Sequence, residues 1–134
     1  MLRIGFLPSD FNPMLLMLGE PEDLRALGGV LRQFARDGGT VQLDELAFCT
    51  ARSTRVLLSN SAGQPGLHAL PDAANAFEWR LDAQRAATFA DAMDDLATAS
   101  RKAGSELLEC TQQEEIQVKV SRGEYTDDFL RGDP

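Results

Sequence analysis

The sequence predicts a single α+β domain in which a largely antiparallel sheet carries two amphipathic helices on one face. Apolar residues alternate with polar ones over residues 40–81 and 116–121, as in half-buried strands. They recur at helical spacing over residues 21–37 and 83–103. The resulting order of strands, helix, strands, helix and hairpin lacks the strand–helix alternation of a doubly wound parallel sheet.

The length and composition agree with one domain over residues 1–134. With 43% hydrophobic residues, a chain of 134 residues buries enough surface to fold without a disulfide or a metal. Polar residues and acids dominate from about residue 122 onward, so we expect an acidic C-terminal tail.

Two short strands and a helix are predicted in the first 37 residues. The strands, over residues 2–7 and 14–19, are separated by a loop with a proline at each end. The helix begins near Pro21, which suits a first turn, and ends near Asp37 before Gly38-Gly39. Gly28-Gly29 in its middle indicates either close packing against a sheet or a locally weak helix.

Three arginines of this helix, Arg25, Arg32 and Arg36, lie together on its outward side. Arginines on an outer helix face pair with nearby acids more often than they bind phosphate. We therefore favour structural ion pairs, although a functional role for this arginine stripe stays open.

Strands with one buried face are predicted between residues 40 and 81, most clearly where Phe77, Trp79 and Leu81 alternate with polar residues. Trp79 is therefore predicted to lie in the core. Residues 60–66 and 71–75 are rich in turn formers, so we expect surface loops there.

Asp82 is placed to cap a second helix over residues 83–103, which Gly104 ends. Ala86, Phe89, Met93, Leu96, Ala97 and Ser100 form its apolar face. Residues 105–110 and 116–121 then form a hairpin, with Ile116, Val118 and Val120 directed inward.

The charge excludes several classes of partner. Thirteen basic and twenty-one acidic residues give a net charge of −8, which opposes binding to nucleic acids and anionic membranes. Residues 106–134 alone carry eight acids and three bases, a net charge of −5. The first apolar run is too short for a signal peptide and no run can span a bilayer, so we expect a cytoplasmic protein.

Few residues offer catalytic chemistry. His68 is the only histidine, and a nucleophilic pair with Cys49 or Cys110 would need the fold to bring them together. We expect His68 at the surface and the two cysteines as reduced structural thiols. No catalytic, cofactor or metal residues are predicted, because neither phosphate-loop nor zinc-ligand spacing occurs.

The pairs of acidic residues also give no evidence of a catalytic site. Neighbouring acids such as Asp94-Asp95 point in different directions, and so do not form a catalytic pair. Asp91 and Asp95 do share a helix face, for which a solvated surface is the favoured interpretation.

Two stretches carry a resemblance to known proteins. The stretches that carry it are Phe77-Glu78-Trp79-Arg80-Leu81-Asp82, leading into Phe89-Ala90-Asp91, and Val118-Lys119-Val120-Ser121-Arg122-Gly123-Glu124-Tyr125. The resemblance is to small bacterial α/β proteins of unknown function. Some of these are similar to immunity proteins of toxin systems. The resemblance rests on strand and turn patterns, covers about a third of the chain and transfers no functional residue.

These features lead to the hypothesis of a non-enzymatic binding or inhibitory protein that meets a basic protein through its acidic C-terminal third. The candidate contacts are Glu114, Glu115, Glu124, Tyr125, Asp127 and Asp128. Tyr125 is equally compatible with packing on the sheet and with anchoring a partner. The alternatives are a self-associating interaction domain, as a homo-oligomer, and a small hydrolase that uses His68 with Cys49 or Cys110.

Overall fold

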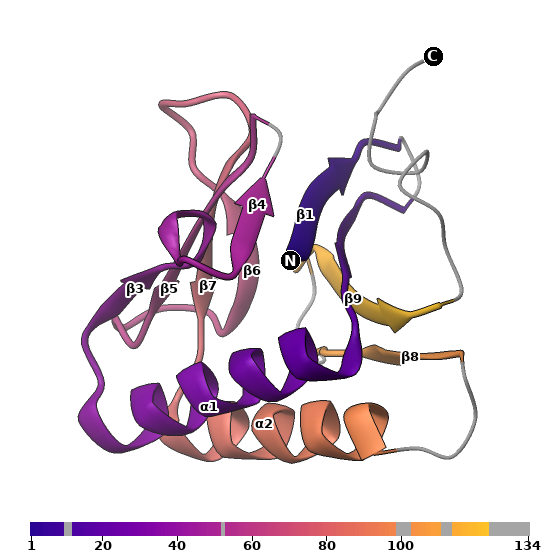
Figure 1. The fold of residues 1–134 in the computed structure, drawn as a ribbon. Coiled ribbons are helices and arrows are strands. Elements are labelled where there is room, and N and C mark those ends of the chain that lie inside the picture. Colours follow the sequence, from indigo (N-terminus) through magenta and orange to yellow (C-terminus); the bar gives the residue numbers. More distant parts are fainter. Residues whose placement is uncertain (10–11, 52, 99–102, 111–113, 124–134) are drawn as a thin grey trace.

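A computed structural model describes residues 1–9, 12–51, 53–98, 103–110 and 114–123. Within these residues the chain forms two helices and nine strands in two mixed sheets, which confirms the predicted α+β class. Figure 1 shows the two helices running side by side beneath the strands. Most strand pairs are antiparallel and some are parallel.

The first sheet has five strands in the order β4-β1-β2-β9-β8. Their bounds are β1 Leu2–Leu7, β2 Met14–Leu18, β4 Cys49–Ala51, β8 Gly104–Leu107 and β9 Gln117–Arg122. The predicted hairpin β8–β9 is present and antiparallel, and the two predicted N-terminal strands, β1 and β2, also pair antiparallel. A parallel pairing of β2 with β9 joins these two hairpins.

The second sheet has four strands in the order β3-β5-β7-β6. Their bounds are β3 Thr40–Gln42, β5 Arg55–Ser59, β6 Gly66–Ala69 and β7 Ala76–Arg80. The 3₁₀ turn η1 (Leu43–Glu45) follows β3, and β7 pairs parallel with β5 and antiparallel with β6.

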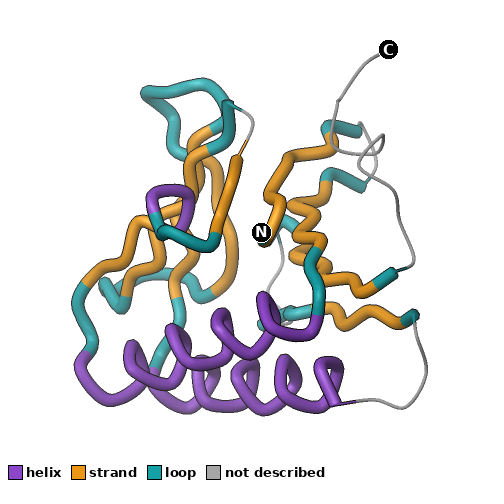
Figure 2. Tube along the Cα trace, viewed as in Figure 1, coloured by secondary structure: helices purple, strands orange, loops and turns teal. Residues whose placement is uncertain are grey.

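The strands are divided between two sheets, whereas the sequence predicted one. Each helix carries the chain from one sheet to the other. Helix α1 (Pro21–Asp37) follows β2 and leads into β3, and α2 (Ala83–Thr98) follows β7 and leads into β8. Figure 2 shows the strands above the paired helices. Alternation of apolar residues reveals a buried face but not the neighbouring strand, so it could not reveal this division.

The core lies between the helices and the sheets. Trp79 and Phe77 of β7 are buried as predicted, and the Trp79 ring stacks on Phe89 of α2 with a centroid distance of 5.9 Å. Phe77 also meets Phe6 of β1 at 4.7 Å, so aromatic contacts link the two sheets. Every described residue of the predicted inward face of α2 is buried, while Ser100 lies outside the described residues.

The two helices pack closely at Gly28. A Cβ atom at this position would lie 3.3 Å from the backbone oxygen of Ala90 and 3.2 Å from a carboxylate oxygen of Asp94. The partner of Gly28 is therefore a helix rather than a sheet, which corrects the sequence prediction. Gly29 faces open space among the described residues.

One arginine of the stripe holds the helices together. Arg32 contacts Asp91 at 2.7 Å and Asp94 at 2.6 Å, and its hydrogen bonds to Asp94 and then Asp91 raise the pKa of its guanidinium. This confirms the predicted ion pairing for Arg32, whereas Arg25 and Arg36 are exposed.

The helix ends follow the sequence signals. The side chain of Asp82 accepts a hydrogen bond of 2.7 Å from the backbone NH of Arg85, as expected of a cap. Asp23 accepts one of 2.9 Å from the backbone NH of Glu20. Gly38 ends α1 with a φ of 68°, in the left-handed region that favours glycine. The described part of α2 ends at Thr98, and residues 99–102 of the prediction lie outside the described residues.

Candidate functional site

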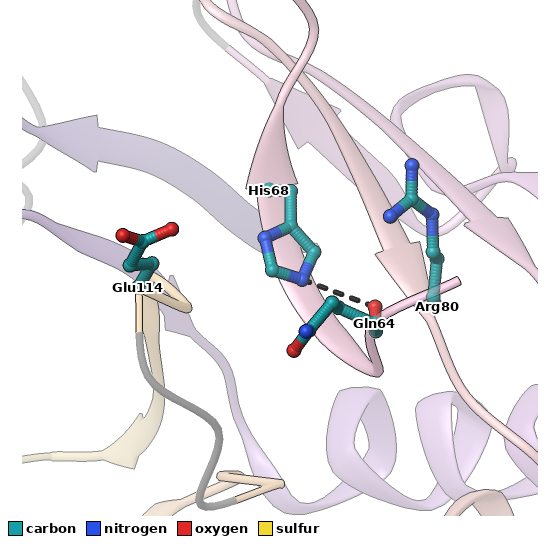
Figure 3. Close-up of a pocket in the computed structure, with 4 residues that line it drawn as sticks. All are labelled: Gln64, His68, Arg80 and Glu114. Atoms are coloured by element: carbon teal, nitrogen blue, oxygen red, sulfur yellow. Dashed lines mark hydrogen bonds between the residues drawn. The ribbon is translucent and has the colours of Figure 1, made fainter.

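A polar cleft of about 330 Å³ is lined by Gln64, His68, Arg80 and Glu114 (Figure 3). Gln64 lies in the loop before β6, His68 lies within β6, and Arg80 ends β7. Glu114 comes from the segment before β9, which belongs to the other sheet. The cleft therefore lies where the two sheets meet.

A short bridge between the sheets positions Glu114. The backbone NH of Ile116 donates to the backbone oxygen of Leu67 in β6 at 2.8 Å, and the two residues form an isolated antiparallel bridge. Next to this bridge Gly66 has a φ of 106°, and a Cβ there would lie 2.9 Å from the Cβ of Glu115. Glycine is thus needed for both the backbone conformation and the close approach of the two segments.

Glu115 has a local structural role. Its carboxylate accepts a hydrogen bond of 3.1 Å from the backbone NH of Cys110, across the loop that joins β8 to β9. The half-buried side chain therefore lies against both Cys110 and Gly66 of β6. Glu114, by contrast, is exposed and has a φ of 70°, which is unusual for a residue with a side chain.

Hydrogen bonds fix the orientation of His68. Its Nε2 lies 3.1 Å from the backbone oxygens of both Gln64 and Pro65. Carbonyl oxygens only accept hydrogen bonds, so Nε2 carries the proton and donates to them. In the neutral ring Nδ1 is then an acceptor, and Figure 3 shows it on the side of the ring that faces Glu114.

The charge of Arg80 is matched by its neighbour Glu78. The Nε and one terminal nitrogen of Arg80 each lie 3.0 Å from the same carboxylate oxygen of Glu78, and the hydroxyl of Ser61 donates to the other oxygen at 2.8 Å. Burial acts to raise the pKa of Glu78, but hydrogen bonds from Ser61, Arg80 and Ser59 outweigh it and hold the pKa below its usual value. Glu78 is therefore ionised at neutral pH and forms a compensated pair with Arg80.

The charge left in the cleft is that of Glu114. No described residue forms an ion pair with it. The site therefore combines an exposed carboxylate, an imidazole acceptor and an amide side chain beside a neutralised arginine. Such a set suits the binding of a polar cationic group better than an apolar ligand.

The cysteines do not join this site. Cys49 and Cys110 are both buried, and neither lines the cleft with His68. Burial, followed by the charge of Asp23 for Cys49 and of Glu115 for Cys110, raises the pKa of each thiol to about 11. Each thiol is thus protonated at neutral pH, and a protonated thiol is a poor nucleophile.

The structure brings together part of the predicted contact surface. Glu114 and Glu115 are adjacent to β6, whereas Glu124, Tyr125, Asp127 and Asp128 lie outside the described residues. The sequence did not single out Gln64 and Arg80. Gln64 lies in a loop and Arg80 at the end of a strand, and neither position carries a motif. Their proximity to Glu114 depends on the pairing of strands that are distant in sequence.

Within the described residues, no three His, Cys, Asp or Glu side chains gather closely enough to hold a metal ion. In the same part of the chain, neither helix has the length and apolar character to cross a membrane. Comparisons with protein-family models, with curated proteins and with solved structures find no match to this chain.

Proposed function

We propose that the chain is a non-enzymatic binding or inhibitory protein whose acidic C-terminal segment, residues 106–134, meets a basic protein, in the manner of immunity proteins. The observation that carries this proposal is the net charge of −5 over residues 106–134. Exposed acids concentrated in one segment attract a positively charged surface and speed its association.

The position of Glu114 supports this proposal. It lies exposed at the junction of the two sheets, on the rim of a cleft that can receive a group from a partner. Glu115 is half-buried against Gly66, and its carboxylate accepts a hydrogen bond from the backbone of Cys110. We therefore assign the partner contacts to Glu114, Glu124, Tyr125, Asp127 and Asp128, with Glu115 as a positioning residue.

Binding kinetics test the proposal. A partner is first captured from the native lysate, and association and dissociation rates are then measured at several salt concentrations. For the variant that combines Glu114→Gln, Glu124→Gln, Asp127→Asn and Asp128→Asn, we expect an association rate lower by about tenfold and a weaker salt dependence. The dissociation rate should change much less.

A second variant controls for net charge. Glu22, Asp37, Glu45 and Asp72 are all exposed and lie outside the C-terminal third. Replacing them with the matching amides changes the total charge by the same amount. This control should associate nearly as fast as the wild type. Equal rates for both variants, or an association rate indifferent to salt, would contradict the proposal.

Self-association is a second candidate function, favoured by Leu107. This side chain is 49% exposed and lies on β8, one of the two edge strands of the five-stranded sheet. An exposed edge strand with an apolar side chain is a common place for another strand to pair. Sedimentation of the wild type and of Leu107→Lys distinguishes the two: a dimer that the substitution dissociates favours self-association, and a monomer in both cases favours the basic partner.

A further inference from the structure

We infer that the cleft formed by Gln64, His68, Arg80 and Glu114 binds a single cationic side chain, lysine or arginine, presented by a protein partner. The source of that side chain rests on the proposed function. The recognition itself depends only on the chemistry of the cleft and is testable with small molecules.

Three hydrogen-bond acceptors face the same space. The carboxylate of Glu114, the Nδ1 atom of His68 and the side-chain amide of Gln64 lie on one side of β6 (Figure 3). A lysine ammonium group offers three donors and an arginine guanidinium offers five, and neither has an acceptor. The site and a cationic side chain are therefore complementary both in charge and in hydrogen-bonding capacity.

The orientation of the His68 ring adds to the complementarity that the carboxylate of Glu114 provides. Its Nε2 proton is engaged by the backbone oxygens of Gln64 and Pro65 at 3.1 Å. The ring therefore turns its acceptor nitrogen toward the cleft. In the neutral form of the ring, an anionic ligand would meet this lone pair as well as the carboxylate of Glu114, and would be repelled by both.

Arg80 does not oppose a cation as strongly as its position suggests. Two of its nitrogens lie 3.0 Å from Glu78, whose lowered pKa keeps it ionised. The pair contributes little net charge, so Glu114 determines the sign of the cleft. Arg80 therefore lines the cleft as one half of an ion pair rather than as an anion site.

The dimensions agree with one side chain. A volume of about 330 Å³ is near the lower end of small-molecule sites, which span roughly 300–1,000 Å³. The cleft is open and polar, so an isolated amino-acid derivative should bind only weakly, in the millimolar range. Tight binding would require the additional surface of a whole partner.

The test uses the fact that His68 is the only histidine, so its imidazole gives a unique nitrogen NMR signal. N-acetyl-argininamide and N-acetyl-lysinamide are titrated into the whole protein, with N-acetyl-citrullinamide and N-acetyl-norleucinamide as uncharged counterparts. We expect at least one cationic probe to shift the Nδ1 signal of His68 saturably, and the uncharged probes to leave it unchanged. The two cationic probes also show which side chain is preferred.

Three variants complete the test. Glu114→Gln should lower the affinity for the cationic probe about tenfold, the effect of losing one charge-assisted contact. Arg80→Gln should retain or raise the affinity, whereas an anion site would lose its ligand. Glu45→Gln, an exposed change outside the cleft, should leave the affinity unchanged. Backbone amide spectra confirm that each variant is folded.

Several results would overturn the inference: no shift with either cationic probe, equal shifts with the uncharged probes, or an unchanged affinity in Glu114→Gln. None of these depends on finding the partner. A salt-dependent basic partner without probe binding would refute the cleft and leave the proposed function standing. Probe binding without any basic partner would support the cleft as a cation site and would refute the proposed function.

Discussion

Replacing Trp79 with alanine should cost about 3–5 kcal/mol of unfolding free energy. The side chain is fully buried, and an aromatic of this kind removes about 150–250 Å² from water, worth roughly 4–6 kcal/mol at about 25 cal/mol per Å². The stack on Phe89 at 5.9 Å is lost as well. One term opposes this loss: Nε1 has no hydrogen-bond partner among the described residues, and removing an unpaired donor recovers about 1–2 kcal/mol.

Trp79→Phe separates the loss of buried apolar surface from the removal of the unpaired Nε1 donor. It keeps most of the apolar surface and removes the unpaired Nε1, so we expect a loss below about 1.5 kcal/mol. Urea unfolding followed by far-ultraviolet circular dichroism measures both variants, because neither retains the only tryptophan. Gln33→Ala, at an exposed position of α1, serves as a surface control. A loss for Trp79→Ala as small as that of the control would refute the placement of this strand face in the core.

Three further predictions follow from packing and burial. Gly29→Ala should raise the free energy of unfolding by about 0.5–1 kcal/mol, because the added Cβ meets open space. Gly28→Ala should raise it less, because the added Cβ meets α2. Thermal unfolding compares the two variants. Gly66→Ala should lower the thermal midpoint and weaken cation binding, since its φ is 106° and Glu115 occupies the space. Burial raises the pKa of the Cys49 and Cys110 thiols from 9.0 to about 11, so the folded state holds more protons than the unfolded state between these pH values. The free energy of unfolding should therefore be highest below pH 9 and should fall as the pH rises toward 11. Urea unfolding at several pH values measures this.

Much of the local structure was predictable because it depends on neighbours in sequence. The bounds of α1, the cap at Asp82 and the burial of Trp79 all follow from periodicity and local hydrogen bonding. The two sheets were not predictable in this way. The parallel pairing of β2 with β9 joins segments about a hundred residues apart, and alternation carries no information about such partners.

The candidate site was even less predictable from the sequence, because its residues come from segments that are distant along the chain. Glu114 could be proposed from charge alone, because acids are concentrated near the C-terminus. Gln64, His68 and Arg80 gain meaning only when the bridge between Leu67 and Ile116 brings β6 beside Glu114. The acceptor role of Nδ1 in His68 depends on two backbone oxygens, whose positions no sequence motif encodes.

Hydrogen exchange on the complex with the captured basic partner, read by mass spectrometry, tests the proposed contact surface most directly. We expect slower exchange on binding in residues 64–69, which contain His68, and in residues 114–128, which contain the acidic contacts. The outward face of α1, with Arg25 and Arg36, should exchange as in the free protein. Protection confined to the helices or to β8, with residues 64–69 and 114–128 unchanged, would contradict the assignment of these two segments as the binding surface.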